Sequence, residues 1–259
     1  MAGVLRGGSA LPDLEFAVED AAGVRLAASV GATRVELCAA LAETGGVTPS
    51  GGAIRAACGQ GLPVHVLVRP RPGGFVYTRE ELDVIGRDAV GAVRAGAAGV
   101  VVGALAADGG PDAEALSRLV AVVRAEAPGA EVTFHRAFDA ALAGGADPAD
   151  ALARLARAGA DRVLTSGGAP DCGQGLGMLG RLVELGREHA PGLQIMAGGG
   201  VTAELVPGLL AAGVHAVHAS ARRRAGSPGG GTGAGSGAEG RAPMDPELAA
   251  AIAAAARRD

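Results

Sequence analysis

The chain has 259 residues, 49% of them hydrophobic and 19% charged, and this length suits one large domain with a sizeable core. Its formal net charge of −4 leaves no concentrated cationic face for nucleic acid, and its longest apolar runs fall far short of the roughly 20 residues that span a bilayer. All 23 basic residues are arginine, which excludes Schiff-base and pyridoxal-phosphate chemistry on a lysine.

Short strand-like segments alternate with helical stretches along the chain. The expected strands cover Leu14–Val18, Arg34–Cys38, Pro63–Val68, Val100–Gly103, Glu131–Phe134, Arg162–Ser166, Leu193–Ala197 and Ala216–Ser220. Four glycines each stand where a helical stretch gives way to a strand: Gly31, Gly96, Gly159 and Gly213. The residue that ends a helix often adopts the left-handed backbone conformation, which glycine favours.

Helix starts are also legible in the sequence. Asp147-Pro148 and Asp245-Pro246 place a capping carboxylate before a proline at the first helical position, and Thr78 with Glu81 fits a capping box. The last of these starts opens a helix expected over Pro246–Arg258. This alternation predicts eight β-α units in a TIM (β/α)8 barrel, with an open doubly wound sheet as the alternative.

The predicted barrel is a single domain over residues 13–259. Residues 1–12 are expected to form a flexible leader. A loop at about 225–243 consists mainly of Gly, Ser and Ala, a composition typical of flexible connections.

Alternate strand residues face the barrel interior, and polar ones are frequent among them. Glu15 and Glu36 lie on neighbouring strands, and His218 shares the inner face of the eighth. The two carboxylates predict an acid/base pair or oxygen ligands for a hard cation. Alternatively, a salt bridge to Arg69 or Arg136 fills the interior, and such arginines are expected to keep the carboxylates ionised.

The stretch TFHRAFD groups three polar residues where the fifth strand gives way to a loop. Parallel strands end where α/β folds bind their ligands, so His135 is a candidate general base or metal ligand. A structural hydrogen bond to a carboxylate is its alternative role. The candidate catalytic set is therefore Glu15, Glu36, Arg69, His135, Arg136 and Asp139.

A glycine run after the seventh strand predicts an anion site. Gly198, Gly199 and Gly200 precede a helix expected to begin near Thr202, and exposed N–H groups at a helix start bind phosphate. A tight turn is the alternative. The expected anion-binding set is Thr165, Ser166, Gly198, Gly199, Gly200, Ser220 and Arg222.

Six segments together resemble the copper-homeostasis CutC family. They are TFHRAFD, RVELCAALAETGGVTPS, VLTSG, IMAGGGV, RPR and HASA, and the likeness runs from about Asp13 to Arg222. The resemblance implies a CutC-type barrel in which Cys38 is one of the thiols proposed to hold Cu(I). Relatives often carry a second cysteine where this chain has Ala17, and Met196 is the nearest soft alternative. A small buried core residue is the other role for Cys38.

The resemblance further implies copper binding or handling in the cytoplasm by a homodimer or larger homo-oligomer. The absence of an apolar signal segment and of a disulfide pattern also favours a cytoplasmic location. The residues themselves favour a rival function, a lyase, isomerase or hydrolase that acts on a small phosphorylated or carboxylated substrate at the barrel mouth. In either case the ligand is a small molecule or a metal ion, and neither nucleic acid nor a membrane is expected to be a partner.

Overall fold

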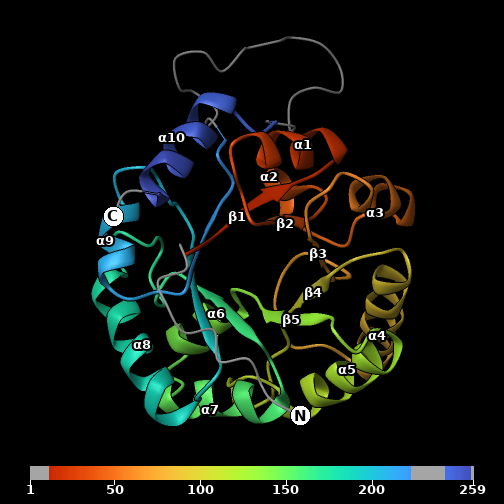
Figure 1. The fold of residues 1–259 in the computed structure, drawn as a ribbon. Coiled ribbons are helices and arrows are strands. Elements are labelled where there is room, and N and C mark those ends of the chain that lie inside the picture. The colour runs from red at the N-terminus through yellow and green to blue at the C-terminus, as the bar shows by residue number, and fades with distance from the viewer. Residues whose placement is uncertain (1–11, 223–242, 258–259) are drawn as a thin grey trace, which may run out of the picture.

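A computed structural model describes residues 12–222 and 243–257, and its strands close into a parallel barrel (Figure 1). The strands are β1 (Asp13–Val18), β2 (Arg34–Leu37), β3 (Val64–Leu67), β4 (Gly99–Val102), β5 (Glu131–Phe134), β6 (Arg162–Thr165), β7 (Gln194–Gly198) and β8 (Ala216–Ala219). Each strand pairs with the next along the chain, and β8 pairs with β1. The predicted (β/α)8 barrel is confirmed, and the predicted strand ends are correct to within one residue.

Helices surround the barrel on its outer face (Figure 1). They are α1 (Ala21–Ser29), α2 (Leu41–Thr44), α3 (Gly51–Cys58), α4 (Arg79–Arg94), α5 (Ala113–Glu126), α6 (Ala137–Ala143), α7 (Pro148–Ala158), α8 (Leu176–His189), α9 (Val206–Ala211) and α10 (Pro246–Ala256). Among the described residues, no helix has both the length and the hydropathy needed to cross a membrane. The expected leader and the Gly-rich loop lie outside the described residues, apart from Pro12 and Pro243 at their edges.

Local sequence signals explain where these helices begin and end. Thr78 and Glu81 form the predicted capping box at α4. The side chain of Asp147 accepts a hydrogen bond at the start of α7, and that of Asp245 does the same at α10. The four helix-ending glycines all have positive φ, as the turn from helix to strand requires.

The segment after β5 differs from the sequence prediction of a loop. Only two residues separate the end of the strand from helix α6, which begins at Ala137, so Asp139 lies in the first turn of a helix. The backbone N–H groups of Phe138 and Asp139 bond to the carbonyls of His135 and Arg136, which accounts for this tight strand-to-helix turn.

The apolar core lies mainly between the strands and the helices. Outward-facing strand residues such as Phe16, Val35 and Phe134 are fully buried there. The barrel interior holds two smaller apolar clusters, Cys38/Leu67/Val101 and Leu164/Met196/Ala216, and is otherwise markedly polar.

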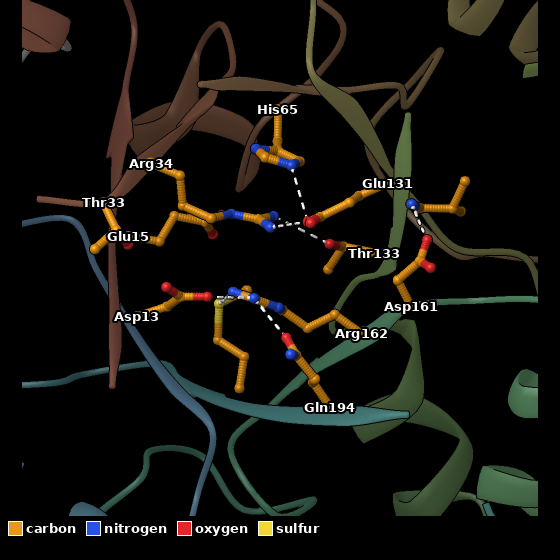
Figure 2. A network of polar contacts seen from close by, with 12 residues as sticks. Asp13, Glu15, Thr33, Arg34, His65, Glu131, Thr133, Asp161, Arg162 and Gln194 are labelled. Atoms are coloured by element: carbon orange, nitrogen blue, oxygen red, sulfur yellow. Dashed lines mark hydrogen bonds and ion pairs between the residues drawn. The ribbon is translucent and has the colours of Figure 1, made fainter. Parts of the chain in front are cut away.

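A network of charged side chains closes the N-terminal end of the barrel, and we call it the polar floor (Figure 2). Its members lie near the starts of their strands: Asp13, Glu15, Arg34, His65, Glu131, Thr133, Arg162 and Gln194. The buried guanidinium of Arg34 donates to Glu15 and to Glu131 at 2.5 and 2.6 Å. Arg162, equally buried, donates to Asp13 and Gln194. Each of these two buried arginines thus has a carboxylate partner, which offsets the cost of removing its charge from water.

Candidate functional site

Two glutamates and a histidine meet inside the barrel, where Glu15 of the polar floor joins Glu36 and His218. Nδ1 of His218 lies 2.6 Å from Oε1 of Glu15, and Nε2 of the same ring lies 3.4 Å from Oε2 of Glu36. Each residue offers one ligand atom, and these atoms all lie within 4.8 Å of one another. Strand pairing produces this cluster, because Glu15 is in register with His218 on one side of β1 and Glu36 pairs with Ala17 on the other.

Burial and neighbouring charges shift the pKa values of the two carboxyl groups in opposite directions. Burial would raise the pKa of Glu15, but Arg34 and His218 outweigh it and hold that pKa well below its usual value. Burial, supported by the Glu15 charge, raises the pKa of Glu36 to about 7 against the influence of His218 and Arg34. For His218, burial lowers the pKa, yet the two glutamates more than compensate and raise it. These influences place the protonation of Glu36 close to neutral pH and keep Glu15 ionised there.

The partner of Glu15 is not the arginine that the sequence suggested. Neither Arg69 nor Arg136 pairs with the central glutamates; Arg34 does, from two residues before Glu36 on the same inner face of β2. The expectation that arginines keep every carboxylate ionised is correspondingly wrong for Glu36. The same two-residue parity that identified Glu36 also places Arg34 inside the barrel, and that signal could have identified it.

Asp139 is the binding partner of the groups that were expected to bind an external anion. Its carboxylate accepts hydrogen bonds from the hydroxyls of Thr165 and Ser166 and from the backbone N–H groups of Ser166 and Gly168. Arg136 adds an ion pair at 2.6 Å. Since Asp139 is itself the anion that these donors surround, the predicted role of Thr165 and Ser166 in phosphate binding is not supported.

The glycine run also differs from its prediction. No helix opens near Thr202, because α9 begins only at Val206 after a short turn. A Cβ atom on Gly199 would lie 3.0 Å from the Arg136 guanidinium, so this glycine gives the arginine room. The alternative of a tight turn fits Gly198, Gly199 and Gly200 better than an anion site does.

The remaining mouth residues do not gather around the glycine run. Arg222 forms an ion pair with Glu19 at 2.8 Å, and Ser220 is half-buried just beyond the end of β8. Arg71 pairs with Glu81 at the start of α4. His135 and Arg69 follow β5 and β3, and each of them lies against the Phe75 ring.

Comparisons with known proteins place this chain in a family. The model of the CutC family matches residues 13–223, nearly the whole barrel. The chain belongs to the CutC family. It is 45% identical over 197 residues to a family protein CutC of Agrobacterium fabrum, covering 76% of this chain and 74% of the relative. The resemblance inferred from the sequence motifs is thereby confirmed.

Solved structures agree with this assignment. A CutC protein of Streptococcus agalactiae, provisionally designated a copper homeostasis protein, is 30% identical with a TM-score of 0.71, over 81% of this chain and 98% of that one. Thiamine phosphate pyrophosphorylase from Pyrococcus furiosus, 14% identical with a TM-score of 0.56 over 94% of this chain and 95% of that one, shares the fold alone.

Copper is the ligand that the CutC name suggests, and Cys38 was the predicted thiol. Cys38 is 1% exposed, packed beside Leu67 and Val101, and its thiol contacts the carbonyl of Val18 at 3.6 Å. Burial, together with nearby glutamates, raises the pKa of this thiol far above its usual range. The soft alternative, Met196, belongs to the other interior cluster, where its sulfur lies 3.7 Å from Arg162. Cys38 and Met196 therefore do not form a two-donor site.

Proposed function

We propose that this CutC-family chain binds a metal ion, with copper as the first candidate, at the Glu15–Glu36–His218 cluster. One observation carries the proposal: three ligand atoms from three strands converge within 4.8 Å in a buried part of the barrel. Imidazole nitrogen and carboxylate oxygen suit a divalent ion such as Cu(II) or Zn(II). The copper-homeostasis designation of the Streptococcus agalactiae relative supports copper as the ion to test first.

The cluster also has the supporting contact that metal-binding histidines usually have. Because Glu15 is ionised, its Oε1 accepts a hydrogen bond from Nδ1–H of His218, which directs Nε2 toward Glu36. A carboxylate behind a ligating imidazole fixes the ring and increases its basicity. Metal binding must displace protons from Nε2 and from Glu36, so affinity is expected to rise with pH through about 7.

The predicted Cu(I) site at Cys38 fits less well. Cu(I) binds thiolates, whereas burial keeps this thiol protonated and Leu67, Val101 and Leu41 surround it. Any Cu(I) binding there is expected to be weak and to depend on Cys38 alone.

Metal titrations of matched variants test the proposal. We expect His218→Ala and Glu36→Gln to weaken Cu(II) or Zn(II) binding by at least about 10–100-fold. Cys38→Ala should leave that binding unchanged, as should His189→Ala at a histidine remote from the cluster. Loss of binding in Cys38→Ala alone would relocate the site to the thiol, and failure of Cu(II), Zn(II) and Cu(I) all to bind would refute metal binding.

A second candidate function uses the same cluster as an acid and base. The observation that favours it is the Glu36 carboxyl, whose pKa of about 7 is suited to proton transfer at neutral pH. Such a group would act on a small carboxylated or phosphorylated substrate, as the sequence also suggested. Incubation with small 2-oxo acids and sugar phosphates in D2O tests it: exchange of a carbon-bound proton that disappears in Glu36→Gln supports catalysis, and no exchange in any compound contradicts it.

Two further properties rest on the family resemblance. We propose a cytoplasmic location and assembly into a homodimer or larger homo-oligomer. Light scattering coupled to gel filtration measures the mass of the assembly, and a monomer at cellular concentrations would contradict the second statement.

A further inference from the structure

Arg69 is a buried cation for which the described residues provide no carboxylate partner. Its two Nη atoms donate to the backbone carbonyls of Thr44, Gly46 and Gly73 at 2.8–3.0 Å, and Nε has no hydrogen-bond partner. The side chain is only 7% exposed. In contrast to the arginines of the polar floor, Arg69 has no carboxylate partner among the described residues. Its charge is therefore not neutralised in a poorly solvated place, where the neutral Tyr77 hydroxyl is its polar side-chain neighbour.

His135 presents a second donor without a partner. The backbone N–H of Ala137 donates to Nδ1 at 3.0 Å, so the ring proton resides on Nε2. Nε2 is buried and has no partner. Burial and the charge of Arg69 lower the pKa of His135 to about 3, which keeps the ring neutral and Nε2 a donor at neutral pH. Gly103 makes this placement possible, because a Cβ atom there would lie 2.3 Å from the His135 ring.

One aromatic ring joins these two donors. The Phe75 centroid lies 5.1 Å from the Arg69 guanidinium carbon and 5.0 Å from the His135 ring centroid. The backbone of Phe75 is fixed in turn, since its carbonyl accepts from Leu105 at 2.9 Å. A cation and a neutral N–H donor therefore face a shared apolar wall, and neither contributes a hydrogen-bond acceptor.

We propose that Arg69 and His135 form a subsite for one oxyanion group, a carboxylate or a phosphate, of a small ligand packed against Phe75. Buried donors without partners are costly, and an anion supplies both the missing acceptors and the missing charge. The subsite is separate from the Glu15–Glu36–His218 cluster and from the glycine run. It uses neither a metal ion nor the donors that Asp139 already occupies.

Histidine ring signals provide the most direct test. Wild-type protein labelled with 15N is titrated with sodium acetate and, separately, with inorganic phosphate at constant ionic strength. We expect one of the anions to shift the Nε2–H signal of His135 in a saturable manner while the signals of remote His189 stay fixed. The more effective anion identifies the group as carboxylate or phosphate.

Two ring-for-ring substitutions separate binding from packing. His135→Phe keeps the aromatic contact but removes the donor, and should weaken anion binding at least about tenfold. His65→Phe is the matched control, because the His65 ring is equally buried and lies over Gly99 in the same way. Equal affinity in both variants, or a His135 signal that responds to neither anion, would overturn the proposal and leave the two donors to bound water. If His135→Phe fails to fold, the wild-type titration alone decides.

Discussion

Removing a buried charge usually destabilises a protein, but replacing Glu36 by glutamine should increase stability relative to wild type as the pH rises through about 7. In the folded protein the pKa of this carboxyl is raised from 4.5 to about 7. A raised pKa means that the folded state holds the proton more tightly, so this contribution to stability is complete below about pH 4.5 and is lost as pH rises through about 7. Glutamine does not ionise and avoids that loss.

The size of the effect follows from proton linkage. Between pH 5 and pH 8, a carboxyl with these two pKa values costs the wild-type protein roughly 2–3 kcal/mol of folding free energy. The stability of Glu36→Gln relative to wild type should therefore improve by a similar amount over this range. Urea unfolding at several pH values measures it, followed by far-UV circular dichroism because the chain has no tryptophan.

Glu15→Gln is the matched control with the opposite expectation. The pKa of Glu15 is lowered, so its ionised form stabilises the protein above pH 4.5 and that contribution is lost only in more acidic solution. This variant should be less stable than wild type throughout pH 5 to 8, because Arg34 and His218 lose their anionic partner. If the Glu36→Gln difference is independent of pH, Glu36 is not a proton-exchanging group near neutrality and the reasoning fails.

Two further substitutions test the charged networks. Arg34→Met leaves Glu15 buried without its guanidinium partner and should lower the free energy of unfolding in urea by about 3–5 kcal/mol. Part of this loss should be recovered when Glu15→Gln is added. A loss below about 1 kcal/mol would show that the pair is not structurally important. Asp139→Asn weakens the contacts with the surrounding donors and should lower the free energy of unfolding by about 2–3 kcal/mol. Asp150→Asn, at an exposed carboxylate, is the control and should change it little. Equal losses in the two variants would contradict the assignment of Asp139 as the internal anion.

The barrel could be predicted because its signals are local. Gly159, for example, ends α7 and turns the chain into β6, and Asp147 with Pro148 starts that helix, so each boundary depends on a few adjacent residues. Inner-face parity likewise identified Glu15 and Glu36. No local signal of this kind predicts which residue a side chain contacts across the barrel.

The candidate site could be predicted only in part for that reason. The sequence grouped Arg136 with Asp139 correctly, and they form an ion pair. It did not predict α6, which turns Asp139 toward Thr165 and Ser166 and leads it to occupy the donors expected for phosphate. Contacts of this kind depend on three-dimensional distances between elements that lie far apart along the chain.

The polar floor has a consequence for how the protein folds as it is synthesised. Arg34 meets Glu131 across 97 positions of the chain, and Arg162 meets Asp13 across 149. Until the second half of the barrel follows, Asp13 lacks Arg162 and Arg34 lacks Glu131, although Arg34 already has Glu15 on the neighbouring strand. A half-barrel ending before β5 could bury these side chains only with incomplete pairing, which makes a stable intermediate at that stage unfavourable. The two ion pairs can thus form only after β5 and β6 have been made, when the second half of the barrel packs against the first.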